Sequence, residues 1–234
     1  METLPNLIPP KGKAQTFADV AYHVADDIVP VLTIDVSKTQ VYFEQHTLLW
    51  KHPSVVISLR EPNGGMKKAA GGGDSALIAE ASGAGMIAFR RDGPGRIVTL
   101  QMPLGREMHV HEHRFLAATR AVGLEVVHVR GAAGLLHQTQ AYNVHKFIAG
   151  KGDGVLWIYA YGQVFEKTLE DGESIDVEPG AWLYKDKMVG METIASRLPL
   201  GRFGNHAMFY INRFTGPGRI AVQSMYMRGQ ATET

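Results

Sequence analysis

The stretch MHVHEHRFLAATRAV, residues 108–122, has a counterpart at the same distance on either side of it. The counterparts are VYFEQHTLLWKHPSV at residues 41–55 and IDVEPGAWLYKDKMV at residues 175–189. The three copies are one period apart, since 122 − 55 = 67 and 189 − 122 = 67. All three have apolar residues at their first, third, eighth, ninth and last positions. A fixed period of this length indicates a structural unit that is repeated along the chain.

The opening residues of the copies predict strands. In the third copy Ile175 and Val177 are apolar, whereas Asp176 and Glu178 are polar. Alternation with a period of two is typical of a strand that has one buried face. The run from Phe115 to Val122 has helix-compatible spacing, but its equivalents do not, so a shared backbone favours strand there as well. We therefore predict an all-β fold.

The repeat also predicts how the chain is divided. We expect an N-terminal extension at residues 1–30, one all-β domain at 31–227 and a disordered tail at 228–234. The domain would consist of three units, at residues 31–93, 94–162 and 163–227. Three such units suggest short strands that close about a pseudo-threefold axis as a barrel or jelly roll, with apolar side chains facing a shared interior.

Composition excludes several classes of protein. The chain has 234 residues, a formal net charge of +1 and no cysteine. The charge gives no reason to expect a nucleic-acid partner, and the lack of cysteine excludes disulfides and thiolate chemistry and fits a reducing compartment. No apolar run reaches the roughly 18 residues that would cross a bilayer. We expect a cytoplasmic protein without a signal peptide, and peripheral membrane association stays open.

A histidine-rich strand is the one candidate for a chemical site. The residues HVHEH at 109–113 place His109, His111 and His113 on one face of an extended strand, about 6.6 Å between successive members. Imidazoles are common ligands of zinc, copper and iron, so these residues are candidate metal ligands. The pattern resembles the His-x-His of cupins, but that motif has a glycine six residues before its first histidine, whereas Gly105 lies four before His109.

The repeat favours a plainer interpretation of the same histidines. His109 and His111 match Asp176 and Glu178 of the third copy, while Met108 and Val110 take the apolar positions. We therefore expect the histidines to face solvent and Met108 and Val110 to be buried. The sequence contains no Gly-x-Ser-x-Gly nucleophile elbow, no phosphate-binding P-loop and no dinucleotide-binding fingerprint. We assign no catalytic residue and no cofactor.

Three segments together resemble a known family. They are FTGPGRIAVQS at residues 214–224, the strand and turn at 172–183, and the glycine-bounded strand at 152–162. They are similar to the altered-inheritance-of-mitochondria (AIM) family, over roughly residues 31–227, with bacterial members. The resemblance implies a fold like that of the tryptophan RNA-binding attenuation protein (TRAP), a short double-stranded β-helix unit present three times as a pseudo-trimer. Mitochondrial members are associated with inner-membrane architecture, and the family supplies no catalytic residues.

Three functions follow from the sequence, in order of preference. The first is a non-enzymatic binding or scaffold protein with protein partners or self-association, because a repeated block presents several similar surfaces. The second is a cupin-like, metal-dependent enzyme that uses His109, His111 and His113. The third is RNA binding, which rests on analogy with the TRAP fold alone.

Overall fold

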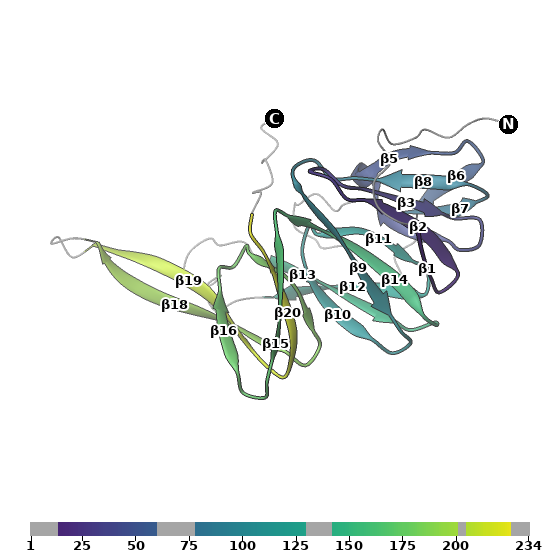
Figure 1. Cartoon of the computed structure of the whole chain (residues 1–234). Coiled ribbons are helices and arrows are strands. Elements are labelled where there is room, and N and C mark those ends of the chain that lie inside the picture. The colour runs from purple at the N-terminus through teal and green to yellow at the C-terminus, as the bar shows by residue number, and fades with distance from the viewer. Residues whose placement is uncertain (1–13, 60–77, 130–141, 201–204, 226–234) are drawn as a thin grey trace.

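The computed structural model describes residues 14–59, 78–129, 142–200 and 205–225, and Figure 1 shows that these residues form β-strands almost throughout. One turn of 3-10 helix, η1 (Gln45–Thr47), follows the fourth strand, and the described residues contain no α-helix. The predicted all-β fold is therefore confirmed. The predicted tail at 228–234 lies outside the described residues.

The strands are grouped here according to the repeat, six to a unit. The first unit consists of β3 (Val31–Asp35), β4 (Val41–Glu44), β5 (Leu48–Lys51), β6 (Val55–Leu59), β7 (Ile78–Gly83) and β8 (Met86–Phe89). The second consists of β9 (Gly95–Met102), β10 (Glu107–His111), β11 (Phe115–Thr119), β12 (Val122–Val129), β13 (Tyr142–Ala149) and β14 (Gly154–Tyr161). The third consists of β15 (Val164–Leu169), β16 (Ser174–Val177), β17 (Trp182–Asp186), β18 (Gly190–Leu200), β19 (Asn205–Thr215) and β20 (Gly218–Gln223). The boundaries between units stay a prediction.

Every unit pairs its strands in the same way. The sixth strand lies between the first and the third, and the fifth lies between the second and the fourth. All of these pairs are antiparallel, and each pairing of third and sixth strands contains one irregularity in register. The irregularities fall at equivalent places: Leu48/Trp50, Phe115/Ala117 and Trp182/Tyr184. The copies thus share local backbone detail as well as strand order.

Neighbouring units are joined by strand pairing. β4 of the first unit pairs with β11 of the second, and β10 of the second pairs with β17 of the third. Each junction produces a six-stranded sheet with three strands from either unit, β6-β7-β4-β11-β14-β9 and β12-β13-β10-β17-β20-β15. The remaining strands form a three-stranded sheet, β16-β19-β18, and a five-stranded sheet, β1-β2-β3-β8-β5.

Two strands precede the first unit. β1 (Ala14–Phe17) and β2 (Val20–Ala25) form an antiparallel pair, and β2 adds to the edge of β3. Val20 and Tyr22 are buried in the core of the first unit, so these strands are part of its packing. Residues 14–25 of the predicted N-terminal extension therefore belong to the sheet.

The buried apolar residues gather in three clusters instead of the single interior that the repeat suggested. Phe43, Val110 and Val177 take equivalent positions of the three copies, and each lies in a different cluster. Trp157 of the second unit packs into the first cluster, and Leu183 of the third unit packs into the second. The three units therefore interlock through side chains as well as through backbone pairing.

The predicted pseudo-threefold, TRAP-like closure is not shown within the chain. A closed ring would need a third junction, between β16 and β5, and neither of these described strands pairs with the other. Figure 1 shows them at opposite ends of the molecule, with the second unit between them.

Candidate functional site

The three histidines of the predicted metal site take three different environments. His109, in β10, is partly buried, and its Nε2 lies 2.9 Å from Oε1 of Glu107. His111, at the end of β10, is only 6% exposed. His113 is exposed in the following turn, where its backbone is left-handed with φ of 60°. Among the described residues no group of three or more His, Asp or Glu side chains could hold a metal ion, so metal binding stays a prediction from the sequence.

Burial along β10 follows the prediction only in part. Met108 and Val110 are fully buried, as expected, but the predicted solvent-facing position is wrong for His111. Its ring packs edge-on against Trp182 of the third unit, with the ring centroids 5.0 Å apart. The next unit covers this face of β10, and a single unit considered by itself could not reveal that cover. Burial lowers the pKa of His111, although the hydrogen bond of Nδ1 with the carbonyl of Glu112 opposes that shift.

His145 joins this region, which sequence spacing did not indicate. It lies directly opposite Val110 in the antiparallel pair β10·β13, whereas His111 lies opposite Val144. Burial first, and then the positive charges of His113, His111 and Arg91, lower the pKa of His145 to about 4. Its Nδ1 atom is buried and has no hydrogen-bond partner within the described residues.

The junction between the first and second units contains a buried ion pair. Glu44 ends β4 at the repeat position that His111 takes in β10, since 111 − 44 = 67. Arg91 donates from Nη2 to Oε2 of Glu44 at 2.5 Å and to the carbonyl of Phe115 at 2.8 Å. Glu44 and Arg91 are 2% and 8% exposed. The guanidinium thus ties the end of β4 to the first residue of β11 in the next unit.

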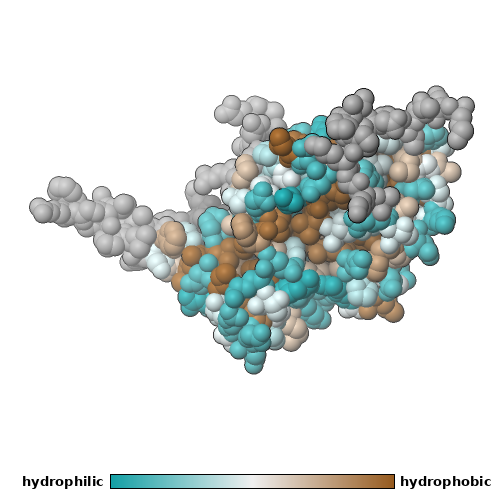
Figure 2. Space-filling view, viewed as in Figure 1, coloured by the Kyte–Doolittle hydropathy of each residue, from teal (hydrophilic) through white to brown (hydrophobic). Residues whose placement is uncertain are grey.

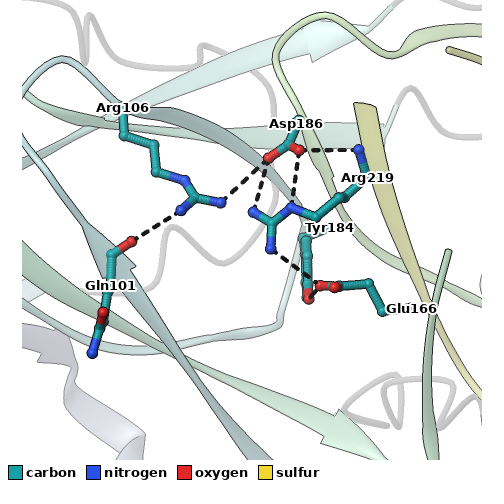
Figure 3. Close-up of polar contacts among 6 residues, drawn as sticks. All are labelled: Gln101, Arg106, Glu166, Tyr184, Asp186 and Arg219. Carbon is teal, nitrogen blue, oxygen red and sulfur yellow. Dashed lines mark hydrogen bonds and ion pairs between the residues drawn. The ribbon is translucent and has the colours of Figure 1, made fainter. Parts of the chain in front are cut away.

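A larger polar network lies at the junction between the second and third units (Figure 3). Asp186 of β17 accepts hydrogen bonds from the backbone N–H and the Nε of Arg219, at 3.0 and 3.1 Å. Arg106, just before β10, lies 3.5 Å from the same carboxylate. Burial raises the pKa of Asp186, against the charges of Arg106 and Lys185. This carboxylate therefore connects the second unit to β17 and β20 of the third.

The network continues to β15. Arg219 donates from Nη1 to Oε2 of Glu166 at 3.4 Å, and the hydroxyl of Tyr184 also donates to Oε2 of Glu166 (Figure 3). Burial and the hydrogen bond to Glu166 both raise the pKa of Tyr184. Since the hydroxyl keeps its proton, it stays a hydrogen-bond donor across the strands of the third unit.

The carboxylate of Glu107 lies beside this network and is surrounded by basic side chains. Besides His109, its carboxylate faces Lys187 of the third unit at 3.1 Å and Lys146 of β13 at 3.6 Å. Burial raises the pKa of Glu107, but the hydrogen bonds of His109 and Lys187 and the charges of the two lysines outweigh it, so the pKa is lowered overall. Glu107 is thus ionised at neutral pH and attracts cations of both units. The ion pairs of Glu107 therefore help to hold the second and third units together.

Comparison with known proteins places this fold in a family. Residues 22–225 match the family described as Mitochondrial biogenesis AIM24. The fold is similar to the crystal structure of protein SPYM3_0169 from Streptococcus pyogenes, with 18% sequence identity, a TM-score of 0.62, and coverage of 88% of this chain and 94% of that one. No curated protein sequence matches the chain. Within the described residues, no helix has the length and apolar character that crossing a membrane requires. Because the match extends over most of its length, the chain belongs to the AIM24 family.

Proposed function

We propose that this protein is a non-enzymatic scaffold or binding protein whose partners are proteins, including copies of itself. One observation carries the proposal. The chain uses the same type of strand junction twice, between β4 and β11 and between β10 and β17. A unit whose edge strands are complementary to those of an identical unit is suited to assembly, because unprotected strand edges pair readily.

The polar residues support this proposal through their contacts. Arg91 with Glu44, and Arg106 and Arg219 with Asp186, all join strands of neighbouring units or elements of one unit. Their charges are neutralised by one another in half-buried or buried positions, where paired charges are stable and unpaired ones are costly. Such contacts serve to fix the relative positions of strands. The cysteine-free sequence supports the cytoplasm as the place where the protein acts.

The surface also supports a binding role. Figure 2 shows a band of hydrophobic colour across the middle of the visible face, between hydrophilic regions above and below it. Among the described residues, the large apolar side chains that are at least 60% exposed are Ile28, Val56, Leu59, Leu104, Phe165 and Met188. An exposed hydrophobic band such as the one in Figure 2 is characteristic of interaction sites.

Two measurements on the purified full chain test the proposal. Multi-angle light scattering over a range of protein concentrations reports self-association, and affinity capture with mass spectrometry reports other protein partners. We expect assemblies larger than one chain, a specific protein partner, or both. A chain that stays strictly monomeric and recovers no partner would rule out the scaffold function.

A further inference from the structure

The two junctions inside the chain are the same junction in their detail. In both, the second strand of one unit pairs with the third strand of the next. The facing residues are Val41–Thr119, Tyr42–Ala118 and Phe43–Ala117 in the first junction, and Met108–Asp186, His109–Lys185 and Val110–Tyr184 in the second. Adding 67 to each number of the first set gives the second set. The register of a junction is therefore a property of the unit, which a further unit would repeat.

One second strand and one third strand take no part in a junction within the described residues. β5 is the third strand of the first unit and ends its sheet, in the order β1-β2-β3-β8-β5. β16 is the second strand of the third unit and ends the sheet β16-β19-β18. Pairing β16 with β5 would place three strands of a third unit beside three strands of a first unit, as in both six-stranded sheets. The two leftover sheets thus correspond to the two halves of one missing junction.

β5 is more exposed than the equivalent strands of the other two units. Leu49 of β5 is 42% exposed, whereas its repeat equivalents Leu116 in β11 and Leu183 in β17 are fully buried. Every residue of β11 is buried, while β5 alternates between partly buried and exposed. The difference has a simple cause, because β11 and β17 each pair with a strand of a neighbouring unit, whereas β5 pairs with no strand of another unit in the described part of the chain.

β16 shows the same difference on the other side. Tyr42 of β4 is fully buried and His109 of β10 is partly buried, but the equivalent Asp176 of β16 is exposed. All four residues of β4 are buried, and only the last of the four in β16 is. The second strand of a unit is thus covered where another unit follows it and exposed where the chain supplies none.

We propose that the chain associates head to tail with copies of itself, through antiparallel pairing of β16 of one copy with β5 of the next. The proposal rests on the scaffold function above and names a second copy of this chain as the partner. Continuing the internal register, it places Lys51 opposite Asp176 and Trp50 opposite Val177. Contacts of this head-to-tail kind generate rings when the rotation closes and filaments when it does not.

The charges fit this register. Asp176 accepts two hydrogen bonds from Arg213 of β19, at 2.7 and 2.8 Å, on the strand that flanks β16 inside the chain. Lys51 of the next copy would approach the same carboxylate from the open side. A carboxylate between two cations on adjacent strands is stabilising, since opposite charges that face each other across strands attract. Hydrogen bonding to Arg213 already lowers the pKa of Asp176, so the carboxylate is ionised at neutral pH.

Disulfide trapping tests the pairing directly, because the native chain has no cysteine. Residues directly opposite each other in an antiparallel pair have Cβ atoms roughly 4.5–5.5 Å apart, close to the reach of a disulfide. Two single variants, Lys51→Cys and Asp176→Cys, carry tags of different size and are mixed and mildly oxidised. We expect a mixed-disulfide dimer that reduction dissolves. The matched control replaces Lys51→Cys with Val56→Cys, since Val56 is 62% exposed on β6 of the same unit and lies off the proposed junction.

The double variant Lys51→Cys, Asp176→Cys shows whether β5 and β16 pair between two copies or within one chain. We expect it to form a ladder of covalent oligomers on a non-reducing gel. A monomer with an intrachain disulfide would overturn the proposal, because the chain would then cover its own edge. Cross-linking no stronger than in the Val56→Cys control would overturn it too. All the replaced side chains are exposed, including that of Asp176 at 39%, and circular dichroism checks that each variant is folded.

Failure here is distinguishable from failure of the scaffold function. If light scattering or affinity capture finds assemblies while the trapping yields no β16–β5 disulfide, the scaffold function stands and this pairing is wrong. If the chain is monomeric and recovers no partner, both are wrong.

Discussion

Glu44 and His111 occupy the same position of the repeat in neighbouring units, and both are buried although both are polar. Each lies at the end of a strand that the following unit covers. The polar atoms find partners there, with Arg91 donating to Glu44 and Nδ1 of His111 in contact with the carbonyl of Glu112. The equivalent residue of the third unit, Glu178, is exposed. At this scale, burial is decided by the neighbouring unit.

The buried ion pair leads to a first prediction. Glu44→Ala should lower the free energy of unfolding by about 3–5 kcal/mol, because it leaves the Arg91 guanidinium buried without its counter-charge. Asp92→Ala is the matched control, since Asp92 pairs with Arg90 while its side chain is 91% exposed, and such a pair contributes about 0–1 kcal/mol. Urea denaturation followed by circular dichroism measures both. Equal losses in the two variants would contradict the assigned role of Glu44.

His145 leads to a prediction about pH. Its pKa falls to about 4 in the folded protein from the ordinary histidine value of 6.5, so the unfolded chain binds more protons between those two pH values. Stability should be unaffected by His145 above pH 6.5 and should decrease as the pH falls toward 4. The loss would be at most about 3 kcal/mol by linkage.

The check is the pH dependence of the melting temperature. His145→Gln should flatten the curve between pH 6.5 and 4, and His23→Gln, in β2, serves as the control for removing a histidine elsewhere. The slope that remains in His145→Gln belongs to other groups with shifted pKa values, among them His46, His109, His111 and the carboxylate of Glu107. An unchanged slope in His145→Gln would show that this residue does not stay neutral in the fold.

At the scale of elements, the three third strands form a natural comparison. β5, β11 and β17 have equivalent positions in the repeat and the same irregular pairing with the sixth strand of their unit. β17 has two charged residues and β5 only one, yet all of β11 and all of β17 except Asp186 are buried, whereas β5 is half exposed. The strand adds the same backbone to its unit in each case, and only its second neighbour differs.

Alanine substitution in these strands should separate the contribution of packing within a unit from that of packing against a neighbouring unit. Leu183→Ala and Leu116→Ala should each lower the free energy of unfolding by about 2–5 kcal/mol, the range for large-to-small changes in a packed core. Leu49→Ala should cost clearly less, measured at a concentration where the chain is monomeric, because Leu49 is 42% exposed. Losses of the same size at all three positions would mean that β5 is covered in the isolated chain.

At the scale of the whole molecule, the described residues form two junctions between units and leave β5 and β16 without a junction partner. Because self-association stabilises the folded state by mass action, the melting temperature should rise with protein concentration. Leu49→Glu should abolish this rise by placing a charge in the proposed junction, with little effect on the monomer.

Val56→Glu is the matched control for this prediction, since it adds the same charge at a 62% exposed position away from β5. It should keep the dependence of the melting temperature on concentration. Differential scanning fluorimetry over a hundredfold range of concentration is sufficient to measure it. A wild-type melting temperature that is independent of concentration would contradict self-association.

The sequence by itself determined the β content and which positions along each strand are apolar. Those features depend on local periodicity, and alternation at Met108, Val110, Ile175 and Val177 is visible without any structure. The family, too, was accessible from short motifs near Gly152, Gly172 and Gly216, because turn and strand chemistry is local.

Only the tertiary structure decided which copies meet and which edges stay open. His109, His111 and His113 are close in sequence but take three environments, whereas His145, far away in sequence, lies opposite Val110 through the antiparallel pairing of β13 with β10. Equivalent residues such as His111 and Glu178 differ in exposure because another unit follows one and not the other. Sequence periodicity reflects which side chains of a strand face the core of their own unit. Contacts between units depend instead on where the tertiary structure places the edges of strands that are far apart in sequence.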